Sequence, residues 1–158
     1  FLDAYLREKG APRAESHGQI VSTSGEKLGE HEGVHHFTIG QRRGLGIAKG
    51  EPLYVIATDP RSQQVTVGRD ADLLRAVLTA GQVNWVSVPG ISHPVNAQVK
   101  IRNRHSAAEA VLHPTGDPQR VEVRFLEPQR AVTPGQAAVF YNGDLVLGGG
   151  WIESDSFI

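Results

Sequence analysis

Three cations at a two-residue spacing are the first feature of this sequence that could do chemistry. Lys100, Arg102 and Arg104 follow the alternating apolar positions of residues 95–99. Alternate residues of a strand share a face, so the three side chains would line one face for about 13 Å, at roughly 3.3 Å per residue. A cationic stripe of this kind fits a nucleic-acid backbone. The alternative is the solvated face of an amphipathic strand, which the net charge of −1 favours.

A second cationic feature is a loop in which Arg42 and Arg43 stand between Gly40 and the pair Gly44 and Gly46. Glycine permits a close backbone approach to a ligand or a positive φ. The arginine fork matches phosphate. We consider a phosphate-contacting loop, against the alternative of a structural loop with two solvated arginines. The spacing matches neither the dinucleotide fingerprint nor the P-loop.

Histidine and glutamine supply the remaining candidates. His31, His35 and His36 lie among glutamates and could bind a metal. On a strand, however, His35 and His36 would face opposite sides, so we expect no metal site. Gln136 follows a Pro-Gly turn signal at the mouth of a strand; it could contact RNA or only end the turn.

The composition favours a binding domain. The 158 residues include 16 basic and 17 acidic residues and 39% hydrophobic residues, as in soluble globular domains. Cysteine is absent, which excludes thiolate catalysis, disulfides and cysteine-ligated metals. Methionine is also absent, so we expect an excised piece or a processed product. We see no apolar run of membrane-spanning length, no leader, and no P-loop or nucleophile-elbow motif.

The elements that must position these residues are predicted to be short strands. Runs rich in Val, Ile, Thr and Tyr alternate with Gly, Pro, Asp and Asn from residue 18 onward. We expect a remnant helix over 1–17, a small β domain over 18–75 and a β-barrel over 76–158. Turns are predicted at 59–62 and 114–118, and a type I′ hairpin turn at Asn142–Gly143.

Four segments together resemble one family. GEHEGVHHFTIGQRRGLGIA, PLYVIATDP, VKIRNR and AVTPGQAAVFYNGDLVLGGGWIE stand in the order found in bacterial tRNA-specific 2-thiouridylases. The resemblance covers nearly the whole chain. It implies a mainly β fold, with a small central β domain followed by a C-terminal barrel similar to those of translation factors. In the family these two domains help to clamp tRNA.

The resemblance also implies an activity for the parent protein. Family members use ATP, with magnesium, to adenylate the C2 oxygen of the wobble uridine in certain tRNAs, and a cysteine persulfide then delivers sulfur to C2. The ATP loop and both catalytic cysteines belong to an N-terminal domain that is expected to be missing here. This chain is therefore expected to be cytoplasmic and non-catalytic alone. Its expected partners are tRNA and, for the full-length enzyme, a sulfur-relay donor protein.

The residues carried over from the family are Arg102, Asn103 and Gln136, and many relatives have an aromatic residue in place of Asn103. We expect Lys100, Arg102 and Arg104 to contact phosphates and Gln136 to make a polar RNA contact. Arg42 and Arg43 are further RNA-binding candidates, or they pack at the seam with the missing domain. Two alternatives stay open: a barrel that binds a sulfur-relay partner or the catalytic domain, and a small hydrolase or ligand-binding barrel that uses His35 or His36.

Overall fold

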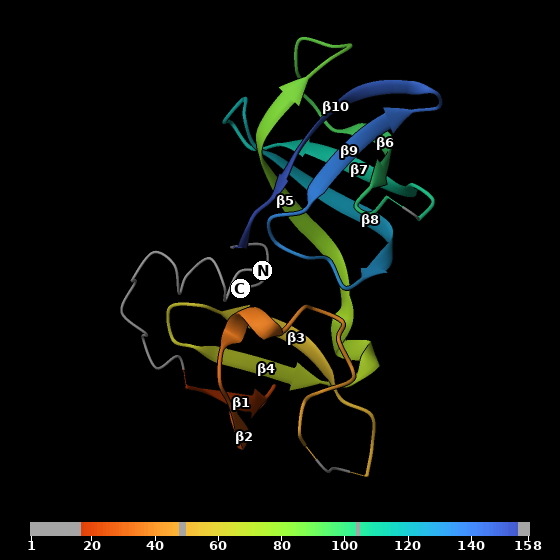
Figure 1. Cartoon of the computed structure of the whole chain (residues 1–158). Coiled ribbons are helices and arrows are strands. Elements are labelled where there is room, and N and C mark those ends of the chain that lie inside the picture. Colours follow the sequence, from red (N-terminus) through yellow and green to blue (C-terminus); the bar gives the residue numbers. More distant parts are fainter. Residues whose placement is uncertain (1–16, 48–49, 104, 155–158) are drawn as a thin grey trace. The chain divides into compact units, whose positions relative to one another are not determined.

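The computed structural model describes residues 17–47, 50–103 and 105–154. The chain divides into two compact units, Phe1–Arg69 and Asp70–Ile158. Each is built from strands, which confirms the mainly β class (Figure 1). The predicted helix over 1–17 lies almost wholly outside the described residues. The domain boundary expected at 75/76 falls inside the first barrel strand, β5 (Leu74–Trp85), whereas the two units divide at 69/70.

The first unit is a four-stranded sheet in the order β2-β1-β4-β3. Its strands are β1 (Gly18–Ser22), β2 (Lys27–His31), β3 (Tyr54–Asp59) and β4 (Gln64–Gly68). The pair β1–β4 is parallel and the other two pairs are antiparallel. Between β2 and β3 the chain forms a 3-10 turn, η1 (Val34–His36), and the arginine loop. The core of the sheet consists of Ile20, Val34, Leu45, Val55, Val65 and Val67.

The turn between β3 and β4 is confirmed at residues 59–63. The Asp59 carboxylate accepts hydrogen bonds from the Arg61 backbone N–H at 2.9 Å and from the Ser62 hydroxyl at 2.6 Å. These two bonds lower the pKa of Asp59, with the Ser62 hydroxyl making the larger contribution. An aspartate that binds its own turn in this way favours the turn over an extended chain.

The second unit is a closed six-stranded barrel in the order β10-β5-β8-β7-β6-β9 (Figure 1). A 3-10 turn, η2 (Asp70–Leu73), leads into β5. The other strands are β6 (Val95–Lys100), β7 (Ala108–Pro114), β8 (Val121–Arg130), β9 (Ala137–Asn142) and β10 (Leu145–Ile152). All pairs are antiparallel.

Alternation along the barrel strands separates the core from the outer face. In β9, Ala138 and Phe140 are fully buried while Ala137 is exposed. In β6, Ala97 and Val99 are buried, so their neighbours Gln98 and Lys100 face outward. The fully buried side chains of the barrel include Leu78, Leu112, Val121, Val123 and Phe140. This interior fixes which side chains can meet a ligand.

The hairpin between β9 and β10 differs from the predicted type I′ turn. Asn142 stays in the ladder and pairs with Leu145, so the two loop residues are Gly143 and Asp144. Gly143 has φ 58°, whereas Asp144 has a negative φ. A single positive φ at the first loop position is the pattern of a type II′ turn, which favours glycine at that position alone.

Candidate functional site

Predicted site residues from three segments meet at one end of the barrel. Lys100, the last residue of β6, pairs with Val139 of β9. Gln136 immediately precedes β9, and the Ile152 N–H of β10 donates to the Gln136 carbonyl at 2.8 Å. Lys100 and the Gln136 side chain therefore belong to the same end of the β6–β9–β10 surface. We call this region the Lys100 end.

The predicted cationic stripe does not continue along a strand. β6 ends at Lys100, and the chain bends at Arg102 and turns at Asn103. The Arg102 Nη2 donates to the Ala131 carbonyl, which ties this turn to a second one. Ile101, the first residue after β6, still points into the core and is 8% exposed. The part of that prediction that put Lys100 and Arg102 on one strand face is wrong, because β6 ends at Lys100.

The turn that holds Arg102 is itself strongly constrained. Ala131 has φ 53° and is 2% exposed. Its N–H donates to the Leu73 carbonyl at 2.9 Å, and its carbonyl also accepts the Thr133 hydroxyl at 3.0 Å. Arg102 therefore holds its own turn to the Ala131 turn, in addition to carrying a positive charge. Asn103 is exposed beside it, and Arg104 lies outside the described residues.

Gln136 is held by its backbone and presents its side chain to solvent. Its N–H donates to the Thr133 carbonyl at 3.3 Å, which closes a turn in which Gly135 has φ 79°. Proline at the second position and glycine at the third are the signature of a type II turn. The Gly135 N–H donates to the Ile152 carbonyl at 2.8 Å. The side chain is exposed, so it is free to meet a ligand at a fixed place.

Trp151 lies on the same surface and was not among the predicted site residues. It pairs with Ala137 of β9 and with Gly81 of β5, and its side chain is 53% exposed. The sequence signal was present in retrospect: a large aromatic ring follows three glycines at an outward position of the last strand. We had interpreted that segment only as part of a hairpin.

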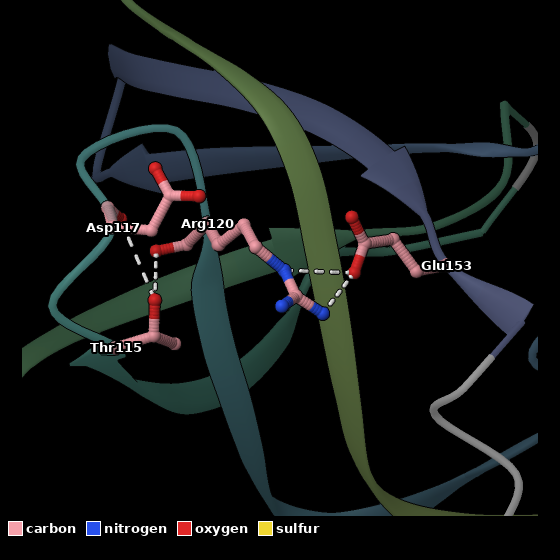
Figure 2. Close-up of polar contacts among 4 residues, drawn as sticks. All are labelled: Thr115, Asp117, Arg120 and Glu153. Carbon is pink, nitrogen blue, oxygen red and sulfur yellow. Dashed lines mark hydrogen bonds and ion pairs between the residues drawn. The ribbon is translucent and has the colours of Figure 1, made fainter.

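On the β5 side of Trp151, an ion pair stands over Gly81. The Glu153 carboxylate accepts the Arg120 Nε at 3.0 Å and Nη2 at 2.6 Å (Figure 2). The Arg120 carbonyl in turn accepts the Thr115 hydroxyl at 3.0 Å. A Cβ added to Gly81 would lie 1.9 Å from Glu153 Oε1, so any side chain at this position would displace the carboxylate. Glu153, the acidic residue nearest to Trp151 in the sequence, is therefore ion-paired.

Arg42 and Arg43 belong to the first unit, in a loop fixed by its own backbone. The Gly40 N–H donates to the Val55 carbonyl, and the Val55 N–H donates to the Gln41 carbonyl. The Gln41 amide also donates to the Arg43 carbonyl at 2.9 Å. Both arginine side chains are exposed, and neither has an ion-pair partner among the described residues.

The glycines of this loop serve its geometry. Gly40, Gly44 and Gly46 have φ of 87°, 77° and 66°. Leu45 between them is 8% exposed and belongs to the core of the sheet. A pocket of about 360 Å³ adjoins the loop. It is lined by Arg42, Gly44, Leu45, Gly46, Ile47, Glu51, Pro52 and Leu53.

The histidines are arranged differently from the prediction. His35 and His36 lie in η1, not on a strand, and their ring centroids are 4.0 Å apart. Within the described ranges, no group of three or more His, Asp or Glu side chains is placed to hold a metal ion. His31 is 7% exposed and has two backbone partners. Its Nδ1 accepts the Gly33 N–H at 3.0 Å, and its Nε2 lies 3.1 Å from the Gln63 carbonyl oxygen.

Two family models match the two units of the chain. Residues 2–69 match a model described as the tRNA methyl transferase PRC-barrel domain. Residues 75–152 match the aminomethyltransferase beta-barrel domain. Over the part of the chain that the structure describes, no helix is long and apolar enough to cross a membrane.

Curated relatives match the chain over nearly its whole length. A tRNA-specific 2-thiouridylase of Solibacter usitatus is 64% identical over 155 residues, which cover 97% of this chain and 42% of the relative. The enzyme of the same name from Koribacter versatilis is 50% identical over 96% of this chain and 41% of the relative. That of Synechococcus sp. strain JA-3-3Ab is 47% identical over 99% and 40%. The chain thus spans about two fifths of the length of these relatives.

Proposed function

The chain belongs to the family of tRNA-specific 2-thiouridylases, and from that premise we propose that it is a tRNA-binding portion of such an enzyme. The observation that carries the proposal is the Lys100 end. There Lys100, the Arg102 turn and the exposed Gln136 converge from separate segments. A folded RNA can be recognised by its shape and a few placed contacts, so a net charge of −1 does not oppose this function.

Each predicted site residue has a stated role in this proposal. Lys100 contacts a phosphate, because its side chain faces outward and is ion-paired to no described residue. Arg102 holds the turn and adds positive charge, and Gln136 makes a polar contact to RNA. Asn103 adds an exposed polar side chain at the Arg102 turn. Arg104 lies outside the described residues, and its expected phosphate contact stays part of the proposal. Arg42 and Arg43 would contact RNA separately, from the first unit.

The chemistry of the whole enzyme is part of the proposal. We propose that the whole enzyme uses ATP to adenylate the C2 oxygen of the wobble uridine in the cytoplasm. The outer sulfur of a cysteine persulfide, supplied by a relay donor, then attacks C2, and the oxygen leaves with AMP. The persulfide S–S bond breaks as the second catalytic cysteine forms a disulfide with the first. This chain has no cysteine, so the persulfide would be carried elsewhere. It also lacks a P-loop, and its described residues hold no metal-ligating cluster. These residues do not fit ATP with magnesium, and no catalytic step is assigned to them.

The test is tRNA binding by the 158-residue chain at two salt concentrations. An unmodified tRNA transcript with a fluorescent label is titrated at about 50 mM and about 200 mM KCl, and the salt slope counts the phosphates contacted. Lys100→Gln should weaken binding and reduce the slope by about one. Lys100 is the better target than Arg102, because removing Arg102 also releases the Ala131 turn.

Arg124→Gln is the matched control. Arg124 lies on β8, three strands around the closed barrel from β9, and pairs with Glu122 at 2.6 Å. Its loss should leave affinity and slope unchanged. Equal effects of the two variants would show that only overall charge matters, and absence of tRNA binding by the chain would contradict the proposal.

A second candidate function is protein docking on the opposite side of the barrel. Leu74 and Val77 on β5 and Leu126 on β8 are 46%, 40% and 66% exposed. They lie on neighbouring strands, next to an irregularity in the β5–β8 register. This surface suits a sulfur-relay partner or the catalytic domain. Leu126→Ser would then weaken partner binding and leave tRNA affinity unchanged.

A further inference from the structure

The largest exposed ring of the barrel stands beside the Lys100 end. Trp151 is 53% exposed, and it is the only aromatic among the exposed large hydrophobic side chains of the described residues. A tryptophan usually buries most of its surface, because its ring contributes more apolar area than any other side chain. A tryptophan ring that is half exposed on a strand is therefore a candidate site for contact with a ligand.

The positions around the ring leave it accessible from one side. Toward β9, its pairing partner is Ala137, and Gly149 precedes it on the same face of β10. Toward β5, the Glu153–Arg120 pair stands over Gly81. Ala137 and Gly149 carry no large side chain, so a flat group can approach the ring over these two positions.

The charges near the ring select the kind of partner. Val139 pairs with both Gly149 and Lys100, so Lys100 lies two strands from β10. At a strand spacing of about 4.8 Å, this puts Lys100 roughly 10 Å to the side of the β10 strand. Gln136 directly precedes Ala137, the partner of Trp151. An isolated ring beside a cation and an amide suits a nucleotide, whose base stacks while its phosphate meets the cation.

We propose that Trp151 is a stacking platform for one unpaired base of the bound RNA. This inference rests on the tRNA binding proposed above and adds a contact of its own. Sequence-specific RNA recognition commonly uses unstacked bases laid against aromatic rings. Asn103, at the nearby turn, offers no ring for this purpose. The outward positions next to the ring on β9 and β10 carry only the small apolar side chains of Ala137 and Val139 and the glycine Gly149, which is little apolar area for a protein interface centred on tryptophan.

The test combines affinity with a signal from the ring itself. In the 158-residue chain, Trp151→Val should weaken binding of the labelled tRNA transcript by about 5-fold to about 100-fold, the range for loss of one base stack. Trp151→Phe keeps a ring and should stay within about threefold of the parent chain. Leu145→Ala removes a similarly exposed apolar side chain, 51% against 53%, at the other end of β10, and should leave tRNA affinity unchanged. Thermal melts should be alike for all variants, since each side chain is mostly exposed.

Indole fluorescence reports the stack directly. The chain has two tryptophans, and Trp85→Phe leaves Trp151 as the single emitter while keeping a ring against Phe140. The tRNA transcript should quench this emission at the concentrations at which it binds. Unquenched emission with bound tRNA, or equal loss of affinity in the Phe and Val variants, would overturn the stacking while leaving the proposed function intact. Absence of tRNA binding would overturn both.

Discussion

At the scale of single residues, Arg102 shows why a side chain's role cannot be assigned from its charge alone. Its sequence context is that of a cation on a strand face. In the structure its guanidinium reaches the carbonyl of a turn residue that has a positive φ and is buried. Charge and spacing are visible in a sequence, whereas the partner that a long flexible side chain finds depends on a turn 29 residues away. Trp151 was missed for a related reason, because its exposure depends on strand register.

His31 carries a prediction at this scale. Its Nδ1 accepts the Gly33 N–H, so that nitrogen bears no proton, and Nε2 must carry the proton that it donates to the Gln63 carbonyl. We expect long-range ¹⁵N–¹H NMR spectra to place the His31 proton on Nε2 rather than on Nδ1. His93, which is exposed, serves as a comparison and should show fast tautomer exchange. A protonated Nδ1 on His31 would contradict the hydrogen-bond assignment.

A second prediction about a single residue concerns Gly81. A methyl group at this position would collide with Glu153 Oε1, so Gly81→Ala should displace the carboxylate and disrupt the two hydrogen bonds that Arg120 Nε and Nη2 donate to Oε2. We expect the free energy of unfolding to fall by about 1–3 kcal/mol, measured by urea denaturation.

Gly29→Ala is the control for Gly81. Gly29 is also a strand glycine, but its added Cβ would meet nothing closer than 3.8 Å. The free energy of unfolding of the Gly29→Ala variant should stay within about 0.5 kcal/mol of that of the parent chain. Equal losses in both variants would show that strand glycines in general, rather than the Glu153 contact, set the cost.

At the scale of elements, strands could be predicted well wherever alternation and turn signals coincide. The alternation after the turn at 59–62 predicts a strand over 64–68, and β4 has the same bounds. The sequence pattern predicts the next strand only over 81–85, whereas β5 begins at Leu74. The run 74–80 does not alternate cleanly, because an irregularity against β8 and an exposed Val77 interrupt the pattern. The end of β6 at Lys100 had no local signal, since Ile101 continues the apolar alternation.

The turn between β3 and β4 predicts a pH dependence. Its hydrogen bonds, the Ser62 hydroxyl first, lower the pKa of Asp59 in the folded state. The ionised carboxylate therefore stabilises the fold above the ordinary aspartate pKa, and this contribution is lost as the pH falls through the lowered value. Between about pH 5 and about pH 2, the free energy of unfolding should fall less steeply in Asp59→Asn than in the parent chain.

The control for Asp59 separates this turn from other acidic groups. Ser62→Ala removes the larger cause of the shift and should flatten the same part of the profile. Glu30, whose pKa is lowered by its hydrogen bond from Lys27, keeps its own contribution in both variants. Identical acid profiles for all three proteins would show that the turn does not take part in acid unfolding.

At the scale of the whole molecule, the two units have separate cores and separate strand networks. We expect residues 70–158 alone to fold into the barrel, with a cooperative thermal transition and dispersed NMR amide signals. The barrel closes on itself and has its own contiguous interior, which is what independent folding requires. A broad, non-cooperative transition would show that the barrel depends on the first unit.

The isolated barrel also tests where RNA binds. Lys100, Gln136 and Trp151 all belong to it, so their effects on tRNA affinity should persist in residues 70–158. Any part of the affinity that depends on Arg42 and Arg43 should be lost, because those residues lie in the other unit. Two linked units bind more tightly than either alone, and a weaker overall affinity is expected for the barrel by itself.

Closure of the barrel has a consequence for how neighbours can attach to it. Each of its six strands pairs with a neighbour on both sides, so among the described residues the barrel has no edge strand that could recruit a strand from another chain. Partners of this unit must be selected by side chains and shape, since β-augmentation is closed to them. The same closure removes a template for edge-to-edge aggregation, which lets the barrel expose a tryptophan without inviting strand exchange.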